Sequence, residues 1–155
     1  FHGSDPRRPC ARRAVTGIVV DASVAVKWVI TEAFSENAAR LLDGSFTLLA
    51  PDLLYAEVTS ALWSLARRGD ISGQDVREAL AVIADAPIDM SVPMRLLMPA
   101  AARWAQDLDH PVYDCFYLAL ALQEQYPLVT ADKRFYEKVR SHPYLADCIR
   151  HVGEI

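Results

Sequence analysis

The sequence contains no long apolar run, few glycines and no internal repeat. Its 155 residues include 6 Gly and 9 Pro, which excludes collagen-like and low-complexity classes. No stretch approaches the roughly 18 consecutive apolar residues of a membrane-spanning helix, so we expect no membrane partner. With 52% apolar and 23% charged residues, a chain of this length is typical of one folded soluble domain.

An excess of basic charge is also lacking. The chain has 16 basic and 20 acidic residues, a formal net charge of −4. Residues 1–14 hold four arginines and one aspartate, so the remainder has 12 basic and 19 acidic residues and a net charge of −7. We expect residues 1–14 to be a production remnant or a disordered start, and residues 15–155 to form the single domain. Its acidity argues against binding nucleic acid mainly by phosphate neutralisation.

The three cysteines are odd in number and far apart in the sequence. Cys10, Cys115 and Cys148 have a spacing that is typical neither of a disulfide framework nor of a zinc site. Cys115 lies in an apolar segment and is expected to be an inert core thiol. We therefore expect the protein to be located in a reducing cytoplasm.

Apolar patterning predicts strands and helices that alternate along the chain. The expected strands are residues 17–20, 46–49, 88–92, 127–130 and 149–152. The expected helices are residues 23–30, 35–42, 52–68, 73–84, a helix starting at Pro99, 113–124 and 133–139. This alternation predicts an α/β fold with three α/β/α layers, in which helices cover both faces of a central, mainly parallel sheet. Ligands of such sheets bind beyond the carboxyl ends of the strands.

Four acidic residues are expected at that edge. Asp21 and Asp132 follow strands, Asp114 begins a buried helix, and Glu57 borders the core face of a long helix. Taken singly, each has a structural explanation. The three aspartates precede helices and could be N-caps, and Glu57 could pair with Arg68 or with a partner from another element. Together, however, four carboxylates at one edge would repel one another, and divalent cations would relieve that repulsion.

Ligands that are all oxygen atoms favour Mg²⁺ or Mn²⁺ over Zn²⁺. Such ions serve phosphodiester hydrolysis, because they generate a nucleophile from water and offset charge that develops on the phosphate. A bound ion would also offset the acidity of the domain. An aspartyl phosphatase with Asp21 as nucleophile ranks last, because Ala22 and Ser23 follow where such enzymes carry a second aspartate.

Four segments, in order, carry a resemblance to a known family. They are IVVDASVAVKW (18–28), PDLLYAEVTSALW (51–63), YDCFYLALA (113–121) and LVTADKRF (128–135). Together they resemble the motif set of PIN-domain nucleases, and most closely the VapC-type ribonuclease toxins of toxin-antitoxin pairs, over about residues 17–152.

The resemblance implies roles for six residues. The acidic quartet that binds Mg²⁺ or Mn²⁺ and supports catalysis would be Asp21, Glu57, Asp114 and Asp132. Asp21 and Asp114 would be its most direct ligands. Ser23 and Thr130 match hydroxyls that orient a carboxylate or a water molecule, although they could equally be ordinary residues of a helix start and a strand.

The resemblance also implies an activity and partners. It implies metal-dependent endonucleolytic cleavage of RNA such as tRNA, homodimerisation, and inhibition by a cognate antitoxin protein. Lys27, Lys133 and Arg134 lie near the expected site in the sequence and are candidates for contacts with RNA phosphates, or are simply surface residues. His110, four residues before Asp114, is a candidate for proton transfer or an ordinary surface histidine.

One alternative from another functional class remains open at this stage. The chain could keep the PIN fold and bind RNA or a protein without catalysis. Chelation distinguishes the two hypotheses, because a metal-dependent ribonuclease stops working in EDTA, whereas a silent module still binds and yields no product.

Overall fold

The centre of the computed structural model is a five-stranded sheet, and the structure describes residues 16–155. The expectation for residues 1–14 therefore lies outside the described residues. The strands are β1 (Gly17–Val20), β2 (Thr47–Leu49), β3 (Ile88–Asp89), β4 (Leu128–Thr130) and β5 (Ile149–His151). Their order is β3-β2-β1-β4-β5 and every neighbouring pair is parallel.

The strand order reverses between β1 and β4. From β1 the chain builds outward through β2 and β3, then returns to the other side of β1 to form β4 and β5. The register pairs Val19 with Leu128 and Val20 with Val129, so the next residues, Asp21 after β1 and Thr130 at the end of β4, lie side by side. In open parallel sheets this reversal opens a crevice at the carboxyl ends of the strands, where ligands bind.

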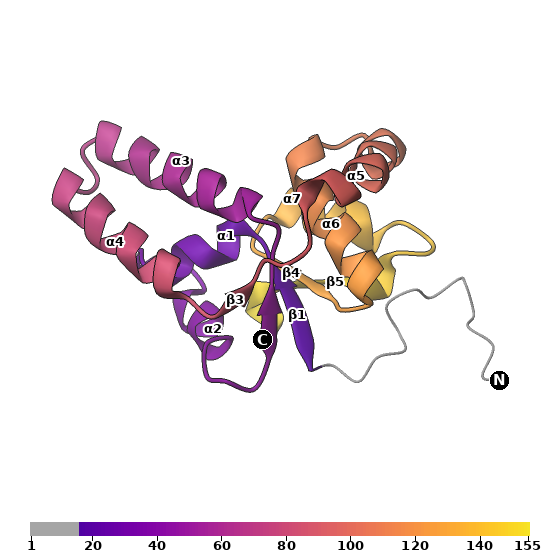
Figure 1. The fold of residues 1–155 in the computed structure, drawn as a ribbon, viewed down its shortest axis with the longest axis horizontal. Helices are drawn as coiled ribbons and strands as arrows, with labels where there is room; N and C mark the ends of the chain where they lie inside the picture. Colours follow the sequence, from indigo (N-terminus) through magenta and orange to yellow (C-terminus); the bar gives the residue numbers. More distant parts are fainter. Residues whose placement is uncertain (1–15) are drawn as a thin grey trace.

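Helices cover both sides of the sheet, which confirms the expected three-layer α/β/α fold. The longer helices are α3 (Leu53–Arg67), α4 (Gly73–Asp85), α5 (Met94–Leu108), α6 (Val112–Glu124) and α7 (Lys133–Arg140). The shorter ones are α1 (Ala22–Ala25), η1 (Val26–Trp28), α2 (Ser35–Arg40), η2 (Ala146–Cys148) and η3 (Val152–Glu154). Figure 1 shows α3 and α4 paired on one side of the strands and α5 and α6 on the other.

The core is formed by the central strands and the helix packed on them. All four residues of β1 are buried, as expected for a parallel strand that is covered on both faces. Helix α6 packs on β1 and β4, and it is apolar on most sides because it is enclosed on most sides. Gly17 is required at the start of β1, since a Cβ there would lie 2.5 Å from the ring of Tyr126.

Several observed elements differ from the expected ones. The segment expected as one helix over residues 23–30 is a single α-helical turn, α1, followed by the 3₁₀ turn η1. Helix α5 begins at Met94 and contains Pro99, because the apolar pattern extends upstream of the proline that was expected to start it. Asp52 occupies the N-cap position of α3, but its side chain accepts no hydrogen bond there. The expected strand 88–92 shortens to β3.

Two further findings concern the cysteines and the membrane. Cys115 is a free, buried thiol, as expected. No helix in the described part of the chain combines the length and apolar character that a bilayer crossing needs.

Candidate functional site

Asp21 leaves β1 into the first turn of α1, and its carboxylate is almost completely buried. Its side chain caps α1 by accepting a hydrogen bond from the Val24 N–H to Oδ1 at 3.2 Å. The Ser23 hydroxyl donates to the same oxygen at 2.5 Å, and the Thr130 hydroxyl donates to Oδ2 at 2.5 Å. The structure therefore places both expected supporting hydroxyls directly on Asp21.

The same two hydroxyls join the β1–α1 loop to the β4–α7 loop. Ser23 Oγ accepts from the Ala131 N–H at 2.9 Å, and Thr130 Oγ1 accepts from the Asp132 N–H at 3.0 Å. Each hydroxyl thus accepts a hydrogen bond from a backbone N–H of the β4–α7 loop. Each also donates a hydrogen bond to the carboxylate of Asp21, which follows β1. Because a hydroxyl whose acceptor side is occupied points its proton the other way, this arrangement fixes both donors on Asp21.

Asp132 follows β4 and begins α7. Its Oδ1 accepts from the Phe135 N–H at 3.1 Å, so it is an N-cap. The N-cap explanation is therefore correct for Asp21 and Asp132, and it accounts for one oxygen of each. The side chain of Asp132 is partly exposed, which leaves its carboxylate accessible.

Asp114 has no capping role, because Pro111 occupies the N-cap position of α6 and Asp114 lies within the first turn. The N-cap explanation is therefore wrong for this residue. Its Oδ2 lies 2.5 Å from Nε2 of His110, which lies four residues earlier, in the loop before α6. One ring nitrogen of His110 and one carboxylate oxygen each of Asp114 and Asp132 all lie within 4.8 Å of one another.

Glu57 comes to this group from α3. Its side chain is half-buried, and Oε1 has no hydrogen-bond partner among the described residues. The hydroxyl of Tyr117 on α6 is also buried without a formal partner, yet it lies close enough to lower the pKa of Glu57. The suggested pair with Arg68 is wrong, since that guanidinium lies 3.3 Å from Asp70.

Burial raises the pKa of three of these carboxyl groups. For Asp21 it raises the pKa from 3.8 to about 7, although the hydrogen bonds from Ser23, Thr130 and Val24 lower it. Burial also raises the pKa of Glu57 and of Asp114.

Asp114 links the group electrostatically. Its charge raises the pKa of Asp21 and of Glu57, and the charge of Asp132 raises the pKa of Asp114 itself. Since such interactions weaken with distance, the other three carboxylates lie near Asp114. Of the expected site residues, the structure thus brings together all four acids and both hydroxyls.

This acidic group fits a hard divalent cation. In the described part of the chain, no Lys or Arg forms an ion pair with any of the four carboxylates. The available ligand atoms are carboxylate oxygens, which Mg²⁺ and Mn²⁺ prefer. The buried Oε1 of Glu57 needs a partner, because an unpaired buried polar atom costs free energy. A cation among these carboxylates would satisfy it.

The three basic residues expected near the site differ in their surroundings. Lys27 has a side chain that is only 9% exposed and lies 2.9 Å from Glu32, which does not fit a contact with RNA phosphates. Lys133 is 82% exposed, 3.9 Å from Glu137, and Arg134 is exposed beside it on α7. Those two remain available to a ligand.

Sequence reasoning missed one residue of the group and underrated another. Tyr117 faces Glu57 from α6, but a tyrosine in an apolar helix has the pattern of an ordinary core residue. His110 was considered only for proton transfer. Its position in the loop just before Asp114 was a usable signal, because the chain there is too short to carry the two side chains far apart.

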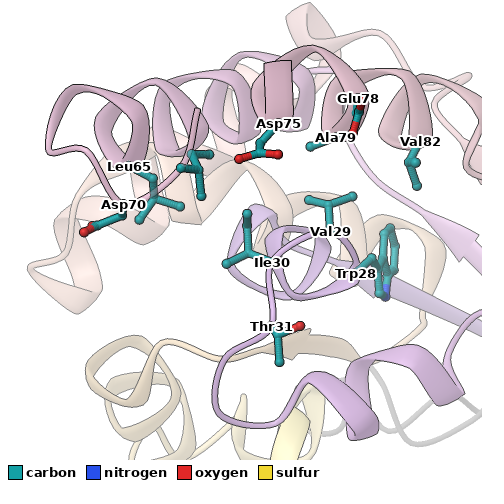
Figure 2. Close-up of a pocket in the computed structure, with 11 residues that line it drawn as sticks. Trp28, Val29, Ile30, Thr31, Leu65, Asp70, Asp75, Glu78, Ala79 and Val82 are labelled. Atoms are coloured by element: carbon teal, nitrogen blue, oxygen red, sulfur yellow. The ribbon is translucent and has the colours of Figure 1, made fainter. Parts of the chain in front are cut away.

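A separate cavity lies away from the acidic group. It has a volume of about 640 Å³ and lies between residues 28–31 and the facing sides of α3 and α4. Figure 2 shows Val29 and Ile30 opposite Asp75 and Glu78 across this space. None of the four carboxylates of the candidate site lines it, so the candidate site is distinct from this cavity.

These observations define a class of protein. It is an α/β domain with a fully parallel sheet, in which carboxylates gather where the strand order reverses. The chain belongs to the PIN domain family, whose model matches residues 18–140. PIN domains are typically nucleases, which are hydrolases, and usually use a divalent metal.

Among solved structures, the chain resembles the crystal structure of PAE2754 from Pyrobaculum aerophilum. The two share 20% sequence identity and a TM-score of 0.63, over 97% of this chain and 94% of that one. At this identity the likeness is one of fold. No curated protein matches the sequence.

Proposed function

We propose that this protein is a Mg²⁺- or Mn²⁺-dependent endoribonuclease of the VapC type, the toxin of a toxin-antitoxin pair. One observation carries the proposal. Asp21 and Asp132 lie at the carboxyl ends of β1 and β4, where the sheet order reverses, and a carboxylate oxygen of Asp114 lies within 4.8 Å of one of Asp132. Membership of the PIN family supports a hydrolase that acts on phosphodiester bonds.

The residues that would hold the cation are Asp21, Asp114, Asp132 and Glu57. A divalent cation bound there supplies a nucleophile from water at neutral pH and offsets negative charge on the phosphate. Ser23 and Thr130 hold Asp21 in one orientation through their hydroxyl protons. The N-cap bond of Asp132 fixes its carboxylate at the start of α7. These contacts pre-organise the carboxylates before the cation and RNA arrive.

The partners belong to the same proposal. The ordered motifs at residues 18–28, 51–63, 113–121 and 128–135 support RNA, such as tRNA, as the substrate. They also support a cognate antitoxin as the inhibitor, a homodimer as the working unit and the cytoplasm as the location. Lys133 and Arg134 are the exposed basic residues nearest to Asp132 in the sequence, so we assign them to phosphate contacts.

The test is cleavage of a pool of tRNA and other structured RNA in Mn²⁺, in Mg²⁺ and in excess EDTA. We expect cleavage in either metal and none in EDTA. Asp114→Asn should lower the cleavage rate by at least about 100-fold, because it removes a charged ligand from the centre of the group. Its fold should be retained, since the amide can still accept from His110.

The matched control is Asp85→Asn, which makes the same change at an exposed position near the end of α4. It should cleave at the wild-type rate. Cleavage by Asp114→Asn at that rate would contradict the role given to the acidic group. RNA binding that persists in EDTA without any product in Mn²⁺ or Mg²⁺ would favour the silent binding module instead.

A further inference from the structure

His110 is held in one position by its surroundings. Its side chain is only 3% exposed, and its ring stacks on the buried ring of Phe135, with 4.6 Å between centroids and 18° between planes. Its backbone N–H donates to the Ala105 carbonyl at 3.1 Å. In the preceding residue, the carbonyl of Asp109 accepts from the Lys138 ammonium. Helices α5 and α7 thus clamp this histidine from two sides.

The clamped ring makes a single polar contact in the described part of the chain. Its Nε2 lies 2.5 Å from Oδ2 of Asp114, whereas Nδ1 is buried without a partner. Asp114, in turn, has no other hydrogen-bond partner for its carboxylate among the described residues. The orientation of the central carboxylate therefore depends on this histidine.

We propose that His110 is a positioning residue that donates its Nε2 proton to Asp114 Oδ2 and thereby fixes the Asp114 carboxylate for the divalent cation. This inference rests on the proposed function and deepens it. An ionised carboxylate can only accept, so Nε2 is the donor in this contact. Groups that hydrogen-bond a metal-binding carboxylate in this way set its orientation, and their loss typically weakens metal affinity 10–100-fold.

The geometry separates this role from two others. A direct ligand would need a free ring nitrogen facing the carboxylates, but Nε2 is occupied by Asp114 and Nδ1 is enclosed by protein. Proton transfer to RNA would need a ring nitrogen within reach of substrate, and the ring of His110 is enclosed. The proton-transfer role considered for His110 on sequence grounds therefore does not fit its position.

The experiment measures Mn²⁺ affinity by calorimetry in the absence of RNA, for the wild type and two variants. His110→Phe keeps a ring against Phe135 and removes the donor. His110→Gln keeps an N–H near the position of Nε2. We expect a 10–100-fold weaker affinity for His110→Phe and an affinity within a few-fold of the wild type for His110→Gln. Denaturation in EDTA should show that both variants are folded.

The control is His142→Phe, the same change just beyond the end of α7 that lies far from Asp132. It should bind Mn²⁺ like the wild type. Pulsed electron paramagnetic resonance of the Mn²⁺ complex should show no nitrogen coupling of the size that a directly bound imidazole gives.

Three outcomes would overturn the proposal. Wild-type affinity in His110→Phe would show that the donor is not needed. An equal loss of Mn²⁺ affinity in His110→Phe and His110→Gln would show that the hydrogen-bond donor at this position does not determine Mn²⁺ affinity. A directly coupled nitrogen would make His110 a ligand. Absence of Mn²⁺ binding by the wild type would instead overturn the proposed function as well, so the two failures are distinguishable.

Discussion

Asp21 receives more hydrogen bonds than a helix cap requires. The bond from the Val24 N–H is the capping interaction, and it would suffice to start α1. The hydroxyls of Ser23 and Thr130 add two further donors on a carboxylate that is 3% exposed. Donors that favour the charged form offset the burial that disfavours it. At this residue the donors offset only part of the effect of burial, since the pKa of Asp21 is still raised to about 7.

Thr130→Val tests this arrangement at the scale of one hydroxyl. The change keeps the shape of the side chain but leaves Asp21 Oδ2 and the Asp132 N–H without their partner. We expect the free energy of unfolding at pH 7 to fall by about 1–3 kcal/mol, as measured by urea denaturation in EDTA. Mn²⁺ affinity should fall as well, because Asp21 loses a contact that fixes its orientation.

Two comparisons make that result specific. Thr130→Ser keeps the hydroxyl and should retain most of the Mn²⁺ affinity. Thr47→Val makes the same change at an exposed position of β2, where surface substitutions usually alter stability by less than about 0.5 kcal/mol. If Thr130→Val matched Thr47→Val in both measurements, the hydroxyl would have no part in holding Asp21.

The position of a single residue in the site could be predicted from the sequence only where its neighbours in the chain determine that position. Asp21 and Asp132 were found because each follows a strand, which places it at the edge of the sheet wherever the strand pairs. The N-cap explanation was wrong for Asp114 because Pro111 takes that position. The partner of Glu57 could not be predicted, because Tyr117 reaches it from another helix, and contacts between distant segments leave no local pattern.

At the scale of elements, α3 and α4 form a helical pair that carries Glu57 to the edge of the sheet. Helix α4 starts with a capping box, in which Ser72 Oγ accepts from the Asp75 N–H at 3.0 Å and Asp75 Oδ2 accepts from the Ser72 N–H at 2.8 Å. Such a box satisfies two backbone donors that the helix itself cannot. It therefore fixes where α4 begins after the turn at Gly69, whose φ is +83°.

Ser72→Ala should loosen α4 without changing the acidic group. Loss of the cap is expected to lower the free energy of unfolding by about 1 kcal/mol, as measured by urea denaturation. RNA cleavage at a temperature where the protein is folded should be unchanged. Ser60→Ala, on the exposed face of α3, is the control and should be neutral or slightly stabilising. A larger loss of cleavage than of stability in Ser72→Ala would mean that α4 contributes to the site.

The elements themselves were largely predictable, but their order in the sheet was not. The alternation of strands and helices predicted a parallel sheet with helices on both faces, and the register of β1 with β4 follows from pairing between segments about 110 residues apart. The sequence holds no local signal for which strand lies beside β1. Yet Asp21 contacts Thr130 only because β4 lies beside β1. The sequence could therefore predict that the site lies at the carboxyl edge of the sheet, but not which side chains meet there.

At the scale of the whole molecule, buried acids oppose folding when no cation is bound. The pKa of Asp21 is about 7 in the folded protein against an ordinary value of 3.8, and burial also raises the pKa of Glu57 and of Asp114. Between pH 4 and 7 the folded state therefore holds protons that the unfolded chain has released. When the folded state binds more protons, stability falls as pH rises.

The metal-free protein should therefore be less stable at pH 7 than at pH 5. The contribution of Asp21 to this loss is on the order of 2 kcal/mol, as measured by urea denaturation in EDTA at the two pH values. Asp21→Asn does not ionise, so the loss should shrink by that amount, leaving the parts due to Glu57 and Asp114. Excess Mn²⁺ at pH 7 should raise the free energy of unfolding of the wild-type protein, because the ion binds only the folded state. The same addition should raise it little in Asp21→Asn. An equal fall with pH in both proteins would show that Asp21 is not held protonated by the fold, and an equal gain from Mn²⁺ would place the cation elsewhere.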